Sequence, residues 1–183
     1  MPARSCAYAS RVPIPPVHPD RPPTRLKRLL TPFALSKAGT WYGINVAARF
    51  DPKLMKLTRG RVNLGGGILP TVLLTVPGRR SGVERTVPLV YFTEGDDVIL
   101  MASSFGRPKL PAWYHNVKAS PEVTLAAGGV SERYTATEVE GPERDALYAK
   151  AKQIYAGYGI YEERTAGIRH VPVLRLRPST APV

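Results

Sequence analysis

The sequence predicts a protein of the α+β class, built on a small and mostly antiparallel β-barrel over residues 62–178. From residue 68 onward, short apolar segments alternate with turn residues and follow one another with few helices between them. Sequential strands with short turns favour a partly open antiparallel barrel over a doubly wound parallel sheet. The expected strands cover residues 69–76, 85–93, 97–103, 122–127, 130–139 and 170–176.

Two helices are expected among these strands. A short helix begins at Ala112, and a longer one spans about 142–155 with Pro142 in the first turn, where proline is favoured. The second and third strands are joined by a Glu94-Gly-Asp-Asp97 turn.

The first third of the chain differs from the rest. Residues 1–23 contain seven prolines and are expected to form an extended, mobile tail, and residues 179–183 form a short second tail. Residues 24–61 are expected to be a basic, amphipathic helical segment, with apolar side chains at helical spacing over 24–38 and again over 41–57. The apolar residues of its first part are Leu26, Leu29, Leu30 and Phe33, with Arg25, Lys27 and Arg28 between them.

The positive charge is concentrated in this N-terminal part. The chain has a net charge of +12, and residues 1–61 contain twelve Lys and Arg against only Asp20 and Asp51. Such asymmetry predicts an anionic partner, either nucleic acid or an anionic membrane surface. Because no nucleic-acid recognition motif is visible, a membrane surface is the expected partner and nucleic acid is disfavoured. The protein is expected in the cytoplasm, or bound to the inner face of the cell membrane.

Several classes of protein are disfavoured by what the sequence lacks. Gly65-Gly66-Gly67 has neither the spacing nor the following helix of a dinucleotide fingerprint, and no phosphate-binding P-loop or serine-hydrolase elbow is present. The three histidines are far apart and Cys6 is the single cysteine, so no metal site is expected.

The segment with most chemical content is Thr75-Val-Pro-Gly-Arg-Arg-Ser-Gly82, followed by Val83-Glu-Arg-Thr-Val-Pro-Leu89. It places Arg79, Arg80, Arg85 and a serine hydroxyl around a tight turn, which suits phosphate or carboxylate. A solvated basic hairpin turn is the alternative interpretation of the same residues.

A second segment, Met101-Ala-Ser-Ser-Phe-Gly-Arg-Pro-Lys-Leu-Pro-Ala-Trp-Tyr-His-Asn116, joins a strand end to an aromatic helical turn. With the arginine turn, it resembles the deazaflavin-dependent nitroreductase family. The resemblance extends to Ala119-Ser-Pro-Glu-Val123 and to spaced tyrosines followed by Arg169 and Val171-Pro-Val173. It implies a split β-barrel similar to those that bind FMN, with coenzyme F-420 lying across one side.

The resemblance also implies which residues hold the cofactor, whose flat ring, phosphate and glutamate tail need an apolar slot and several cations. The anionic portion is expected on Arg79, Arg80, Ser81, Arg85 and Lys109. The ring and ribityl chain are expected on Thr86, Val87, Pro88, Leu89, Val90, Met101, Ala102, Ser103, Ser104, Ala112, Trp113, Tyr114, His115 and Asn116, with Tyr158 beside them. The alternative is that Val87, Leu89 and Met101 are barrel core and that His115 is a helix surface residue.

The expected reaction is hydride transfer from the reduced cofactor to a quinone, a nitroaromatic or a similar flat electrophile. Tyr158 and Ser103 are the candidate catalytic donors, and Tyr155, Tyr161 and Ser103 are the candidate acceptor-binding residues. Gly157 and Gly159 argue against a regular helix there, and a packed aromatic patch is the alternative. A non-catalytic deazaflavin carrier and, less favoured, an FMN protein remain alternatives, and the sequence sets no oligomeric state.

Overall fold

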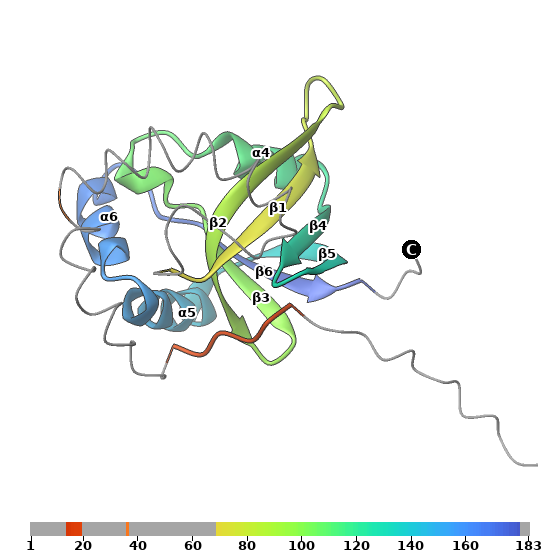
Figure 1. Cartoon of the computed structure of the whole chain (residues 1–183). Coiled ribbons are helices and arrows are strands. Elements are labelled where there is room, and N and C mark those ends of the chain that lie inside the picture. The colour runs from red at the N-terminus through yellow and green to blue at the C-terminus, as the bar shows by residue number, and fades with distance from the viewer. Residues whose placement is uncertain (1–13, 20–35, 37–68, 180–183) are drawn as a thin grey trace, which may run out of the picture.

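Figure 1 shows the computed structural model of the chain, which describes residues 14–19, 36 and 69–179. The helical segments expected over 24–38 and 41–57 lie outside the described residues, except for Ser36. The arrangement described below therefore concerns the barrel, the helices packed on it and one short N-terminal segment.

The barrel has six strands in the described part of the chain, and every neighbouring pair is antiparallel. The strands are β1 (Thr71–Pro77), β2 (Glu84–Glu94), β3 (Asp97–Met101), β4 (Glu122–Ala127), β5 (Val130–Val139) and β6 (Val173–Pro178). Their order is β1-β2-β3-β6-β5-β4, and pairing of β1 with β4 closes the barrel. The predicted fold class is confirmed, but the barrel is closed where a partly open one was expected.

Two strands differ from their predicted ends. β3 stops at Met101 because the chain then enters a single 3₁₀ turn, η2 (Ser104–Gly106), and leaves the sheet. β6 begins after Pro172, which has no N–H to donate to a ladder. The carbonyl of Pro172 accepts the N–H of Ala102 at 2.9 Å, so these two strand ends still lie side by side.

The core has two parts because β3 is buried on both faces. Val98 and Leu100 point into the barrel, whereas Ile99 and Met101 point outward against the helices. The barrel interior is filled by side chains that include Val72, Leu74, Val98, Leu100, Leu125, Tyr134, Leu174 and Leu176. The outer cluster includes Phe92, Ile99, Met101, Leu147, Tyr148, Ile154, Tyr158 and Tyr161.

Three α-helices are described: α4 (Ala112–Ala119), α5 (Gly141–Ile154) and α6 (Gly157–Thr165). α4 lies near the β1–β2 turn, and α5 and α6 cover the opposite side (Figure 1). The doubt about a helix near Gly157 was wrong. A Cβ at Gly157 would lie 2.3 Å from the ring of Tyr155, so glycine allows that ring to pack where it does, although glycine lowers helix propensity.

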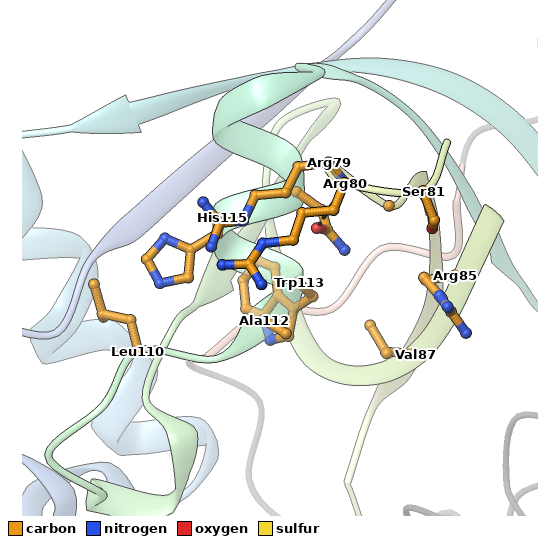
Figure 2. A pocket seen from close by; sticks show the side chains of 11 residues that line it. Arg79, Arg80, Ser81, Arg85, Val87, Leu110, Ala112, Trp113 and His115 are labelled. Atoms are coloured by element: carbon orange, nitrogen blue, oxygen red, sulfur yellow. Dashed lines mark hydrogen bonds between the residues drawn. The ribbon is translucent and has the colours of Figure 1, made fainter. Parts of the chain in front are cut away.

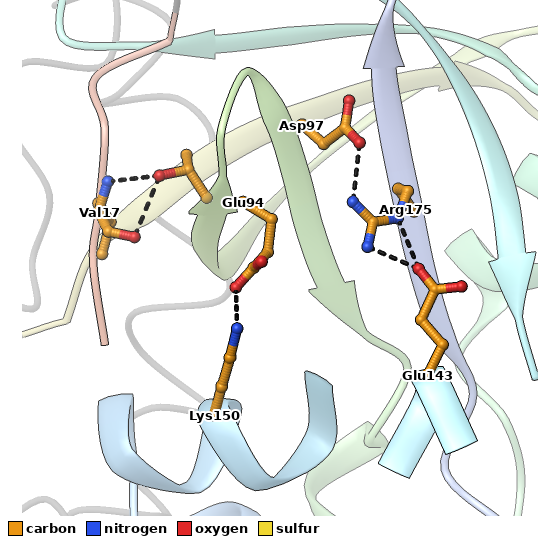
Figure 3. Close-up of polar contacts among 7 residues, drawn as sticks. Val17, Glu94, Asp97, Glu143, Lys150 and Arg175 are labelled. Atoms are coloured by element: carbon orange, nitrogen blue, oxygen red, sulfur yellow. Dashed lines mark hydrogen bonds and ion pairs between the residues drawn. The ribbon is translucent and has the colours of Figure 1, made fainter. Parts of the chain in front are cut away.

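Residues 14–19 pack against the barrel, so the prediction of a mobile tail fails for this part of residues 1–23. Ile14 is only 3% exposed and belongs to the barrel core. The hydroxyl of Tyr91 donates to the Pro15 carbonyl at 2.8 Å, and the Thr93 N–H donates to the Val17 carbonyl at 2.9 Å. The Val17 N–H donates to Thr93 Oγ1 at 3.0 Å, and the Thr93 hydroxyl donates to the Val17 carbonyl at 3.1 Å (Figure 3).

Ion pairs connect α5 to the barrel. Arg175 on β6 contacts Asp97 at 2.8 Å and Glu143 at 2.6 Å, and Lys150 contacts Glu94 at 2.6 Å (Figure 3). Arg175 is the least exposed of these side chains, and its guanidinium has two carboxylate partners. These pairs hold α5 in register with the strands, and the exposed ones contribute little to stability.

Candidate functional site

The turn between β1 and β2 carries the arginines that the sequence singled out. The Gly78 N–H donates to the Val83 carbonyl at 2.9 Å, and the Gly82 N–H donates to the Gly78 carbonyl at 2.7 Å. Gly82 has φ +66°, a conformation that a residue with a side chain rarely adopts. These bonds fold the backbone inward and leave the side chains of Arg79 and Arg80 exposed.

Helix α4 forms the floor beside this turn. It follows Pro111, an extended residue at its N-cap, and it buries Trp113, Tyr114 and Asn116. Asn116 Oδ1 accepts the backbone N–H of Arg79 at 3.2 Å. A side chain of α4 therefore holds the arginine turn in place, a role for Asn116 that the sequence did not indicate.

The β1–β2 turn, strand β2 and helix α4 surround an open cavity of about 560 Å³. Its lining residues are Gly78, Arg79, Arg80, Ser81, Arg85, Val87, Leu110, Ala112, Trp113, His115 and Asn116. Arg79 and Arg80 extend from the turn over α4 toward His115, and Arg85 and Val87 form the opposite wall (Figure 2). The cavity thus combines a cationic rim with an apolar surface formed by Trp113, Val87 and Leu110.

The arginines at this rim lack a carboxylate partner. Within the described residues, none of Arg79, Arg80 and Arg85 forms an ion pair. By contrast, Lys118, Arg144, Lys150, Lys152 and Arg175 each contact a carboxylate at 3.0 Å or less. Three cations around one cavity repel one another unless an anion lies between them. The site is therefore suited to a ligand that carries negative charge at one end.

The far side of α4 is fixed to β5 by one carboxylate. Glu138 Oε2 accepts the Tyr114 hydroxyl at 2.8 Å and contacts the Lys118 ammonium at 3.0 Å, and these two residues are one helical turn apart. Burial alone would raise the pKa of Glu138, but the hydrogen bonds from Lys118 and Tyr114 outweigh it and hold the pKa below its ordinary value of 4.5. Tyr114 thus anchors the helix, and its hydroxyl is committed to Glu138.

We expect Glu138→Gln to lower the free energy of unfolding at neutral pH by about 1 kcal/mol, because the charged acceptor is lost. The folded-state pKa of Glu138 lies below 4.5, so its stabilisation is present above pH 4.5 and is lost as pH falls through that lower value. The stability gap between wild type and variant should therefore close in acid. Urea unfolding at a series of pH values checks this, with Glu163→Gln on the exposed side of α6 as the control. A gap that is constant with pH would contradict the assignment.

The tyrosines of the α5–α6 corner pack against one another. The hydroxyls of Tyr155 and Tyr161 are 3.2 Å apart, and the ring of Tyr158 contacts those of Tyr155 and Tyr161 with centroids 5.6 and 6.1 Å away. Tyr148 donates to the Tyr158 carbonyl at 2.9 Å. Burial raises the pKa of both Tyr158 and Tyr161, so these phenols keep their protons at neutral pH.

The structure brings nine of the predicted cofactor residues into the cavity: Arg79, Arg80, Ser81, Arg85, Val87, Ala112, Trp113, His115 and Asn116. Gly78 and Leu110 also line it and were not predicted. The other predicted cofactor residues do not line this cavity: Thr86, Pro88, Leu89, Val90, Met101, Ala102, Ser103, Ser104, Lys109, Tyr114 and Tyr158. Alternation explains part of this, because on β2 Arg85 and Val87 share a face, while Thr86 Oγ1 points to Thr75 Oγ1 at 2.9 Å.

The alternative interpretations can be compared with the structure at single residues. Met101 is 6% exposed within the outer cluster and Leu89 packs against the barrel interior, so both belong to the core. Val87 packs against that core and also lines the cavity. His115 is half-buried and lines the cavity.

Comparison with known proteins gives a consistent result. A family model described as F420H(2)-dependent quinone reductase matches residues 49–178. An F420H(2)-dependent quinone reductase of Mycobacterium tuberculosis is 34% identical over 134 residues, which is 70% of this chain and 87% of that protein. The solved structure of an F420-H2 dependent reductase is 38% identical, covers 59% of this chain and 94% of its own, and has a TM-score of 0.55. A solved structure described as a domain-swapped dimer is 34% identical, covers 68% of this chain and 94% of its own, and has a TM-score of 0.56.

Proposed function

Since the chain belongs to the F420H(2)-dependent quinone reductase family, we propose that its cavity binds coenzyme F-420 and that its physiological acceptor is a quinone. The chain is accordingly an oxidoreductase, as the sequence predicted, and F-420 is its cofactor. When bound, this cofactor supplies a hydride to a flat acceptor.

The single observation that supports this use of the cavity is its cationic rim over an apolar floor. Arg79, Arg80 and Arg85 have no carboxylate partner among the described residues, and Trp113 and Val87 lie below them. A ligand with a phosphate and a glutamate tail at one end and a flat ring at the other matches both parts. FMN has the phosphate but no glutamate tail, so it would leave part of the rim unneutralised.

The protein's own groups then have separate tasks. The arginine forks and the Ser81 hydroxyl bind the anionic groups, and Asn116 keeps the turn that carries Arg79 in its position. The apolar surface formed by Trp113, Val87 and Leu110 excludes water from the space that a ring would fill.

We place the acceptor toward the α5–α6 corner. Tyr158 is the proposed proton donor or orienting group, because its ring packs against those of Tyr155 and Tyr161 at the centre of this corner. Tyr155 and Tyr161 are the proposed walls, and their linked hydroxyls and tilted rings form a flat-sided aromatic surface. Nitroaromatics are a second proposed class of acceptor, since they share the flat shape and electron deficiency of quinones.

Turnover distinguishes this proposal from a non-catalytic carrier. Purified protein mixed with reduced F-420 and menadione should restore the absorbance of oxidised F-420 in proportion to enzyme concentration. Omission of menadione and omission of enzyme are the two controls. Tight binding of F-420 without any menadione-dependent reoxidation would favour the carrier.

We also propose that the basic N-terminal segment attaches the protein to an anionic membrane surface. In the described residues, no helix has the length and apolar character needed to cross a bilayer. The support is the sequence pattern of residues 24–38, where Arg25, Lys27 and Arg28 alternate with leucines. Such attachment would suit an enzyme whose acceptor is a quinone dissolved in the bilayer.

Neutralising these cations tests the attachment better than deletion does. Removal of residues 1–38 would also remove residues 14–19, which pack on the barrel. We expect the triple variant Arg25→Gln, Lys27→Gln and Arg28→Gln to bind anionic liposomes with about a hundredfold lower affinity in a sedimentation assay. The reason is that each cation near the surface contributes about 1 kcal/mol. Equal sedimentation of variant and wild type, or tighter binding of wild type to duplex DNA at matched salt, would contradict the membrane proposal.

A further inference from the structure

The loop between β3 and α4 holds an unusual run of backbone conformations. Ser104, Phe105 and Gly106 have φ values of 52°, 57° and 72°. Only the third is glycine, so the first two carry the steric strain of a side chain in the left-handed region. In the described part of the chain they are the only non-glycine residues with positive φ. Such strain persists only where the surrounding structure imposes it.

Arg169 bridges the two ends of this loop. Its Nη2 donates to the Ser103 carbonyl at 2.9 Å and to the Arg107 carbonyl at 2.8 Å, and its Nε also donates to the Arg107 carbonyl at 3.1 Å. The planar guanidinium can reach both carbonyls at once, which a lysine ammonium could not reproduce with the same geometry. The turn also has its own backbone hydrogen bonds, from the Gly106 N–H to the Ser103 carbonyl at 3.0 Å and from the Arg107 N–H to the Ser104 carbonyl at 3.1 Å. Arg169 adds a side-chain bridge from a distant part of the sequence.

The clamped loop packs directly on α6. A Cβ at Gly106 would lie 3.2 Å from Tyr161 Cα and 3.0 Å from Arg164 Cδ, so the backbone of the loop touches the helix. The ring of Phe105 lies edge-on to the ring of Tyr161, with centroids 6.2 Å apart, and Phe105 is 38% exposed. Ser103 at the start of the loop and Tyr161 on the helix are thereby set at a fixed separation.

We infer that Arg169 is a positioning residue for the electron acceptor: it holds residues 103–107 against α6 and so fixes Ser103 and Tyr161 as two walls of the acceptor site. This inference rests on the proposed function, because it uses the acceptor position given above. It goes further by assigning the acceptor side to a strained loop that Arg169 maintains. Arg169 does not line the cavity with the arginine rim, so its loss is expected to affect the quinone more than the cofactor.

Arg169→Ala should lower kcat/KM for menadione about ten- to a hundredfold, the scale of a small misplacement at a reacting centre. The Kd for oxidised F-420, measured by fluorescence quenching, should stay within about threefold. Arg169→Lys should fall between wild type and alanine, because an ammonium can bind one of the two carbonyls. Arg177→Ala removes an exposed arginine of β6 and should change neither quantity.

A second readout does not require turnover. Trypsin should cleave after Lys109, just beyond the clamp, faster in Arg169→Ala than in wild type or Arg177→Ala. Unchanged cleavage and unchanged kcat/KM in a folded Arg169→Ala protein would overturn the inference, as would an equal loss of F-420 affinity. Should the alanine variant not fold, Arg169→Lys decides by the same split between kcat/KM and Kd. A wild type that binds F-420 but does not reduce menadione would instead contradict the proposed function, and with it this inference.

Discussion

Arg79→Ala combined with Arg80→Ala is expected to weaken F-420 binding about a hundredfold while the fold stays intact. Each arginine contributes charge-assisted hydrogen bonds worth about 1.5 kcal/mol to an anionic ligand. Both side chains are exposed on a turn and have no carboxylate partner among the described residues, so their removal costs the native structure little. Fluorescence quenching measures the Kd, and thermal unfolding measures the stability.

Arg133→Ala combined with Arg177→Ala is the matched control. These exposed arginines lie on β5 and β6, and removing them changes net charge by the same amount. If the control substitutions weaken F-420 binding as much as the turn substitutions do, the net positive charge of the protein, and not the arginines of the cavity, accounts for the affinity. If the turn variant is folded and binds F-420 as wild type does at low salt, the arginine turn is not the anion site.

Tyr158→Phe should lower turnover with menadione by about a hundredfold or more and leave the Kd for F-420 within a few fold. The physical reason is loss of a positioned proton donor, an effect typically worth ~10² to 10⁴ in rate. The ring is kept, so its contacts with Tyr155 and Tyr161 should survive. Steady-state kinetics at saturating F-420 gives the turnover.

Tyr134→Phe makes the same chemical change inside the barrel and serves as the control. Turnover should be unchanged there. If Tyr158→Phe instead loses F-420 affinity and keeps its turnover per bound cofactor, the phenol belongs to the cofactor and not to the acceptor.

Local patterns in the sequence were sufficient for the strands and the arginine turn. Alternating apolar residues and short turns are properties of neighbouring residues, and they predicted every barrel strand to within a few positions. The density of arginine, glycine and serine around Arg79 and Arg80 likewise pointed to this turn, which lines a cavity in the structure. That the cavity binds an anion stays a prediction.

What sequence reasoning missed depends on contacts between distant residues. α6 was doubted because glycine has low helix propensity, whereas the ring of Tyr155 leaves no room for a side chain at Gly157. The packing of residues 14–19 depends on Tyr91 and Thr93, far along the chain. The anchoring of Tyr114 by Glu138 and the clamp formed by Arg169 are also non-local, and no local spacing indicates them.

The central claim is that the cavity between the arginine turn and α4 binds the F-420 cofactor. The most direct test is to titrate wild-type protein separately with F-420, FMN and NADPH and to follow quenching of ligand fluorescence at two salt concentrations. We predict saturable binding of F-420, tighter than that of either other ligand and weakened by salt, because exposed arginines hold its anionic groups. Equal or tighter binding of FMN, or no saturable binding of F-420, would contradict it.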